Sequence, residues 1–147
     1  MGILTKPTAI TSILTTDLNS LADSTNSALS SAMDFTIADT AHRLPLGSFT
    51  LTVAAQGSAR SSGAKVKLFI VPAFDGTNYD ATNETTAIAS GSFNLDAATT
   101  ARQCSLLHVA IPPCPFKVFL RNETGQPLAA SGNILEVVAY SDDPSGS

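Results

Sequence analysis

The stretch Phe49-Thr50-Leu51-Thr52-Val53 decides the fold of this chain. Its large apolar side chains alternate with threonines, and a period of two is typical of a β-strand with one buried face. A second stretch, Lys65-Val-Lys-Leu-Phe-Ile70, alternates in the same way, with the lysines and Phe69 on one face and Val66, Leu68 and Ile70 on the other. Both stretches therefore predict strands of a half-buried sheet.

Similar stretches recur along the chain and are separated by turn signals such as Gln56-Gly57, Asp75-Gly76 and Pro112-Pro113. About six to eight strands, without a convincing helix between them, predict an all-β fold: a single antiparallel β-sandwich that is jelly-roll-like. Further strands are expected at 87–95, 103–111, 116–121 and 133–140. The expected core side chains are Phe49, Leu51, Val53, Leu68, Ile70, Phe93, Leu95, Leu107, Val109, Val118, Leu120, Leu135 and Val137.

The composition limits the class of protein. The chain has 147 residues, enough for one domain, and only 14% of them are charged, with a net charge of −4. Proteins that bind nucleic acid or anionic lipid rely on an excess of Lys and Arg, so we expect neither a nucleic-acid partner nor a membrane partner. No apolar run reaches the roughly 20 residues of a membrane helix, and the first residues do not resemble a secretory signal.

The first 33 residues differ from the rest, because they are rich in Ser and Thr and carry few large apolar side chains. We expect an arm over residues 1–33 with at most one short helix near residues 15–23, the sandwich over 34–140 and a frayed tail over 141–147. Such an arm needs a surface to lie on, which is either an adjacent subunit or shell, or the open end of its own sandwich. The candidate contact residues are Ile10, Ile13, Leu14, Leu18 and Leu21.

Residues suited to catalysis or metal binding are sparse. The two histidines, His42 and His108, have no nucleophile motif beside them, so we expect no catalytic residues and no enzyme. Cys104, His108 and Cys114 could supply three metal ligands, but their spacing is unlike that of zinc sites, and we expect no metal and no cofactor. The two cysteines are expected to be unbonded thiols, with a disulfide as the alternative.

Two further features have alternative interpretations. The loop Asp75–Asp80 has oxygen-bearing side chains spaced as in a calcium loop, but Asp75-Gly76 after an apolar run favours a hairpin turn. Lys65 and Lys67 could contact an acidic shell surface, or they could protect an exposed edge strand from association, which we consider the better interpretation.

Several stretches resemble small virion structural proteins of tailed bacteriophages. They are Leu14-Thr-Thr-Asp-Leu-Asn-Ser-Leu-Ala22, Leu68-Phe-Ile-Val-Pro-Ala-Phe-Asp-Gly-Thr-Asn-Tyr79, Gly91-Ser-Phe-Asn-Leu95 and the run from Phe119 to Leu135, Phe-Leu-Arg-Asn-Glu-Thr-Gly-Gln-Pro-Leu-Ala-Ala-Ser-Gly-Asn-Ile-Leu. Such proteins include capsid decoration, or cement, proteins that commonly sit as trimers on the outside of the head. The resemblance carries over no catalytic residue.

The resemblance implies a capsid decoration protein that binds the assembled head and bridges coat subunits. Its expected partners are the major capsid protein and other copies of itself, as a homo-oligomer that is expected to be a trimer. Its expected location is the capsid surface of the virion, after synthesis in the cytoplasm of the host bacterium. Two alternatives stay open: a tail or baseplate component, and a carbohydrate-binding host-attachment module that would use the Asp75–Asp80 loop and Tyr79.

Overall fold

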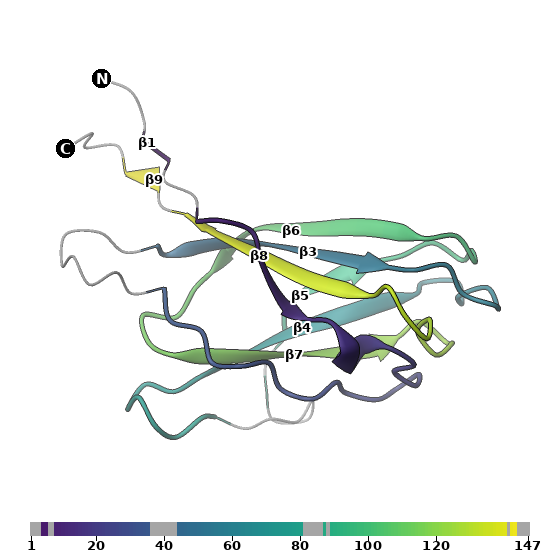
Figure 1. Cartoon of the computed structure of the whole chain (residues 1–147), viewed down its shortest axis with the longest axis horizontal. Coiled ribbons are helices and arrows are strands. Elements are labelled where there is room, and N and C mark those ends of the chain that lie inside the picture. Colours follow the sequence, from purple (N-terminus) through teal and green to yellow (C-terminus); the bar gives the residue numbers. More distant parts are fainter. Residues whose placement is uncertain are drawn as a thin grey trace.

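The computed structural model describes residues 4–5, 8–35, 44–80, 87, 89–140 and 142–143. A four-stranded sheet with the order β2-β8-β3-β6 packs face to face on a three-stranded sheet with the order β5-β4-β7, as Figure 1 shows. All neighbouring strands are antiparallel, and the chain passes back and forth between the sheets, so the predicted all-β, jelly-roll-like sandwich is confirmed. The strands of the sandwich are β2 (Thr11–Leu14), β3 (Leu46–Val53), β4 (Lys65–Pro72), β5 (Ala89–Asn94), β6 (Arg102–Ala110), β7 (Phe116–Glu123) and β8 (Ile134–Tyr140).

The core lies between the sheets, and β3 shows why the sequence pattern works. Its positions alternate between buried and half-buried, with Phe49, Leu51 and Val53 fully buried. Two of the expected core residues, Ile70 and Val109, are only partly buried and pack against the core. The expected core residues that the structure does bury are Phe49, Leu51, Val53, Leu68, Phe93, Leu95, Val118, Leu120, Leu135 and Val137.

Leu107 was a wrong core prediction, because its side chain is 67% exposed. A β-bulge causes the error: between the pairs Gly47↔Val109 and Phe49↔Leu106, β6 uses one more residue than β3. His108 takes a left-handed backbone conformation here, with φ of 56°. One extra residue reverses the facing of every side chain after it, so strict alternation puts Leu107 on the wrong side.

Phe69 also differs from its predicted place on a polar strand face. It stacks on Phe119 with ring centroids 4.6 Å apart, on the outer side of the three-stranded sheet. Val71 completes this second cluster, against which Leu29 and Tyr79 pack. This sheet therefore buries apolar side chains on both faces at the β4–β7 centre, which a half-buried pattern cannot predict.

Much of the expected arm lies on its own sandwich. Residues Thr11–Leu14 form β2 at the edge of the four-stranded sheet, and a short 3-10 helix, η1 (Thr16–Leu18), follows. Leu14 and Leu18 are buried in the core, Ile13 and Leu21 pack partly against it, and Ile10 is 68% exposed. In this structure Leu14 and Leu18 therefore occupy the alternative place, the open end of their own sandwich. A contact of Ile10 with another subunit stays a prediction.

Residues 24–33 run alongside the edge of β7, and every third one of them donates a backbone hydrogen bond to this strand. Ser24, Ser27, Ser30 and Met33 donate their backbone N–H groups to every second carbonyl of β7, at 2.7–2.9 Å. The hydroxyl oxygens of Ser27 and Ser30 accept hydrogen bonds from the intervening N–H groups, at 3.0 and 2.9 Å. We call Ser24, Ser27 and Ser30 the serine ladder. It satisfies the backbone edge that a terminal strand otherwise leaves open.

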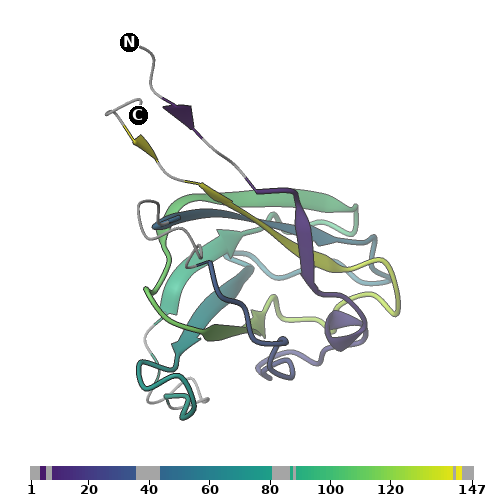
Figure 2. The ribbon, with the colours of Figure 1, turned by 60° about the vertical axis from the view of Figure 1, so that its left-hand side comes forward.

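Two short strands, one from each end of the described part of the chain, lie side by side beyond the sandwich. β1 (Leu4–Thr5) pairs with β9 (Asp142–Asp143), and together they project from the body, as Figure 2 shows. The pairing continues the antiparallel contact of β2 with β8, with Thr8 hydrogen-bonded to Ala139 between the two pairs. Asp142 and Asp143 belong to the segment that was expected to be frayed, and the structure pairs them with β1.

Candidate interaction surfaces

Among the described residues, no group of three or more His, Cys, Asp or Glu side chains could hold a metal ion. The Nδ1 atom of His108 lies 2.8 Å from the hydroxyl oxygen of Tyr140, on the outer side of the four-stranded sheet. Cys104 and Cys114 are unbonded, as expected. The Cys104 thiol donates to the carbonyl of Asn94, and burial raises its pKa. His42 lies outside the described residues.

The Asp75–Asp80 loop is organised as a turn. The Asp75 carboxylate accepts hydrogen bonds from the backbone N–H groups of Thr77 and Asn78, at 2.8 and 2.7 Å, and from the Asn78 side chain. These bonds, above all the one from the Asn78 backbone, lower the pKa of Asp75. The turn opens a long connection, since β4 ends at Pro72 and β5 begins at Ala89, so it is no tight hairpin.

Two aromatic rings belong to this loop. Phe74 is 71% exposed, and the ring centroid of Tyr79 lies 4.5 Å from the ammonium group of Lys117. The loop therefore presents an apolar ring to solvent beside a second ring that is already engaged by a cation.

The outer side of the four-stranded sheet is almost free of charge. Thr50 and Ser105 share a hydrogen bond of 2.8 Å across its centre, and Glu136 is the one charged residue at the outward positions of β3, β6 and β8. We call this surface the neutral face, and the exposed Leu107 lies on its edge strand. Its outward residues are Leu46, Ser48, Thr50, Thr52, Gln103, Ser105, Leu107, His108, Ala110, Ile134, Glu136, Val138 and Tyr140. Burying such a surface requires little desolvation of charge.

The outer side of the three-stranded sheet carries the opposite kind of surface. Glu123 lies 3.8 Å from Lys65, 3.1 Å from Lys67 and 3.2 Å from Arg121. We call these three basic residues, with Glu123 among them, the cationic cluster. The expectation that the lysines protect an edge strand was wrong, because β4 is the central strand of this sheet.

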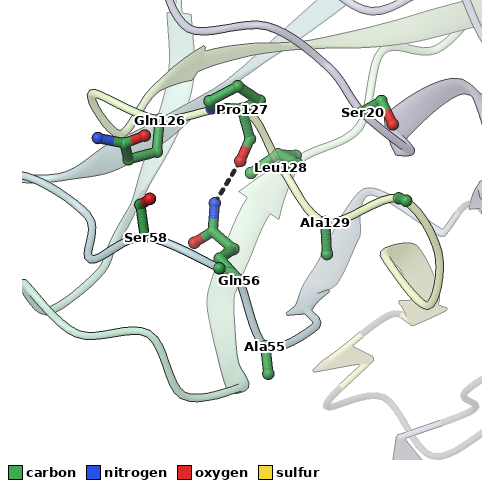
Figure 3. Close-up of a pocket in the computed structure, with 10 residues that line it drawn as sticks. Ser20, Ala55, Gln56, Ser58, Gln126, Pro127, Leu128 and Ala129 are labelled. Carbon is green, nitrogen blue, oxygen red and sulfur yellow. Dashed lines mark hydrogen bonds between the residues drawn. The ribbon is translucent and has the colours of Figure 1, made fainter.

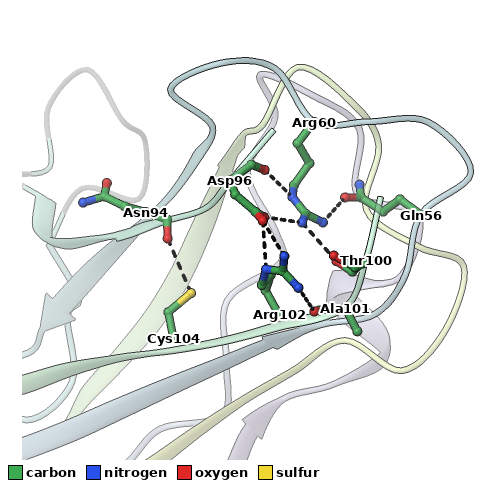
Figure 4. Close-up of polar contacts among 8 residues, drawn as sticks. All are labelled: Gln56, Arg60, Asn94, Asp96, Thr100, Ala101, Arg102 and Cys104. Atoms are coloured by element: carbon green, nitrogen blue, oxygen red, sulfur yellow. Dashed lines mark hydrogen bonds and ion pairs between the residues drawn. The ribbon is translucent and has the colours of Figure 1, made fainter. Parts of the chain in front are cut away.

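Arg60 links the loop between β3 and β4 to the loop between β5 and β6, as Figure 4 shows. Its guanidinium is fully buried and donates to the Asp96 carboxylate at 2.8 Å, to the Asp96 and Thr100 carbonyls at 3.0 Å and to Gln56 at 2.8 Å. Arg102 binds the other carboxylate oxygen of Asp96. Hydrogen bonds from Arg60 and then Arg102 lower the pKa of Asp96.

The contact of Asp96 with Arg60 and Arg102 is expected to make the stability of the protein depend on pH. The pKa of Asp96 is lower in the folded state than its ordinary value of 3.8. Ionised Asp96 therefore contributes to the free energy of unfolding above pH 3.8, and this contribution is lost as the pH falls through the pKa of the folded state. The difference in urea midpoint between the wild type and Asp96→Asn is therefore expected to shrink as the pH falls from about 6 to about 2.5. A difference that stays constant over this range would contradict the assignment.

An open cleft of about 470 Å³ lies beside these loops, as Figure 3 shows. Gln56 donates from its side-chain amide to the Pro127 carbonyl, at 2.6 Å, across the cleft. The lining residues are Ser20, Ala55, Gln56, Gly57, Ser58, Gln126, Pro127, Leu128, Ala129 and Ala130, none of them charged. Ser20 and Ser58 supply hydroxyl groups to this lining, but none of the lining side chains could act as a base to activate them.

Two buried asparagines near this cleft were missed by the sequence analysis. Asn122 donates to the carbonyls of Leu21 and Gln126, at 2.9 and 2.8 Å, and accepts from the backbone N–H of Thr124 at 3.0 Å. Asn133 donates to Asn19 and Ala129. The stretches 14–22 and 119–135, which both carry the resemblance to phage proteins, are therefore joined by side-chain hydrogen bonds. The residues that carry the resemblance have a structural role.

Comparisons with known proteins give structural neighbours only. No protein-family model matches the chain, and no curated protein matches it. A CBM36-1 domain of a multidomain xylanase, from the hindgut metagenome of Trinervitermes trinervoides, is 13% identical with a TM-score of 0.44, over 94% of this chain and 98% of that one. A carbohydrate-binding module CBM36, in complex with calcium and xylotriose, is 14% identical with a TM-score of 0.42, over 95% and 93%. A CBM4 structure is 13% identical with a TM-score of 0.32, over 83% and 75%.

Within the described part of the chain, no helix has the length and apolar character needed to cross a membrane.

Proposed function

We propose that this protein is a non-catalytic structural component of a phage particle, a capsid decoration protein that binds the assembled head and bridges coat subunits. The neutral face carries the proposal. It is an extended sheet surface with Glu136 as its one charged outward residue, and Leu107 stands exposed on its edge strand. Surfaces of this kind bury well against another protein, because their centre lacks charges that would need partners.

The mechanism is mass action. A protein that binds only the assembled shell stabilises that shell by RT ln(1 + [L]/Kd), which is about 2.7 kcal/mol for each site at a concentration of 100 Kd. Many copies on one particle multiply this effect. The proposed partners are the major capsid protein and other copies of this chain, which by the resemblance would form a closed trimer.

Binding to heads that lack the protein tests the proposal. The wild type is expected to bind such heads and to raise their heat resistance. Leu107→Glu is expected to weaken binding about tenfold, because a charge would be buried at the contact. Phe74→Glu is the matched control. Phe74 is as exposed as Leu107, but it lies in the loop after β4, a strand of the three-stranded sheet, and so outside the neutral face. Failure of the wild type to bind would overturn decoration.

A tail or baseplate component is the first alternative, and the number of copies in purified particles distinguishes it. Hundreds of copies would indicate the head, and roughly six to a few dozen would indicate the tail or baseplate.

Carbohydrate binding is the second alternative, and the exposed ring of Phe74 is the observation that favours it. Sugar rings pack on exposed aromatic faces. In a glycan-binding screen, this alternative requires a bound glycan whose affinity falls with Phe74→Ala or Tyr79→Ala and is unchanged by Leu107→Glu.

A further inference from the structure

The basic residues of the chain are unevenly placed. Four of the eight Lys and Arg residues, Lys65, Lys67, Lys117 and Arg121, lie at outward positions of β4 and β7. At the outward positions of these two strands, all of which the structure describes, Glu123 is the one acidic residue. The outward positions of β3, β6 and β8 hold no Lys or Arg. The two sides of the sandwich therefore differ in charge as well as in strand number.

The cationic cluster keeps a positive charge after its internal pairing. Lys65, Lys67 and the one carboxylate of Glu123 leave a local charge of +1 (2 − 1 = 1) in a chain whose net charge is −4. The side chains of Lys65 and Lys67 are 42% and 33% exposed, so both reach solvent. Glu123 lies near both lysines and balances one of their two positive charges.

We propose that the cationic cluster is a docking surface for an acidic protein surface. Charge complementarity identifies the partner: the lysines of the patch stand on the central strand of their sheet and keep a positive charge, although the chain as a whole carries a net charge of −4. A cluster of this size is expected to add affinity and association rate at low salt, and to lose both as salt rises.

The inference deepens the proposed function and rests on it only for the identity of the partner. A protein that bridges coat subunits needs two separate contacts. The neutral face and the cationic cluster lie on opposite outer sides of the sandwich, so they can meet two neighbours at once.

Titration of purified protein with labelled poly-L-glutamate at about 20 mM salt tests the inference without phage heads. The double variant K65Q/K67Q is expected to weaken binding roughly four- to twenty-five-fold, at two- to five-fold for each lysine. Glu123→Gln is expected to strengthen it, because the charge of the two lysines and residue 123 rises from +1 to +2 (2 − 0 = 2). Lys117→Gln, a lysine at the other end of the same face, is the matched control and is expected to change binding less than twofold.

If the cationic cluster is a docking surface, K65Q/K67Q weakens the binding of poly-L-glutamate and Glu123→Gln strengthens it. These opposite effects distinguish docking from a merely structural role. If the cluster only stabilises the sheet, both variants change the urea midpoint and neither changes binding. K65R/K67R is expected to restore binding, and Lys67→Glu serves as the charge-reversal variant if Glu123→Gln does not fold.

Three outcomes would overturn the inference: no binding of poly-L-glutamate by the wild type, a shift of K65Q/K67Q and Glu123→Gln in the same direction, or tighter binding of duplex DNA than of poly-L-glutamate. Failure of the protein to bind heads, with the charge dependence on poly-L-glutamate intact, would overturn decoration alone.

Discussion

Replacing Leu18 with alanine is expected to lower the free energy of unfolding by about 2–5 kcal/mol. The side chain of Leu18 is fully buried in the core of its own sandwich, so the change removes apolar contacts and leaves a cavity. Ile10→Ala is the matched control within the same segment, because Ile10 is 68% exposed, and it is expected to change stability by less than about 0.5 kcal/mol.

Urea unfolding of the isolated protein measures both changes. Because the protein is studied without any partner, a large effect of Leu18→Ala means that the segment is seated on its own domain. Equal and small effects of the two variants would instead mean that residues 11–18 leave the sandwich in solution and bind only a neighbour.

Replacing Arg60 with methionine is expected to cost about 3–5 kcal/mol of folding free energy. Methionine fills much of the same space, but the carbonyls of Asp96 and Thr100 and the side chain of Gln56 lose their buried donor. Unpaired polar groups in the interior carry the full penalty of lost hydration.

Arg102→Met provides the comparison for Arg60→Met, because Arg102 binds the same carboxylate from a side chain that is 43% exposed. Water can replace it, so the cost is expected to stay below about 1 kcal/mol. Thermal unfolding of both variants distinguishes them, and similar losses would show that burial of Arg60 does not govern its contribution.

The sequence predicts the sandwich because alternation and burial agree over most strands. Phe49, Leu51 and Val53 show the pattern without interruption, and the structure buries all three. The pattern fails at Leu107, where a bulge adds one residue to β6, and at Phe69, where a loop covers the outer side of the sheet. Both failures arise from contacts between distant segments, which a local period cannot register.

The candidate surfaces were harder to predict than the fold. That Lys65 and Lys67 share a strand face is evident from their spacing, but their place on a central strand follows from the strand order. The serine ladder had a detectable signal, since serine recurs at residues 24, 27 and 30. Its meaning depends on β7, which is far away along the chain: Ser27 and Leu120, which share a hydrogen bond, are 93 residues apart.

The pairing of β1 with β9 has a practical consequence for display and permutation. Since Leu46 pairs with Tyr140 at one end of β3 and Thr52 with Ile134 at the other, the terminal strands leave the sandwich at the end opposite the loops after β3 and β7. A cargo domain attached next to β1 or β9 would therefore lie at the same end of the sandwich and leave the loops at the opposite end unobstructed. For the same reason, a short linker could connect β9 back to β1, and new ends could be opened near Gly57 or Gly125 with both sheets intact.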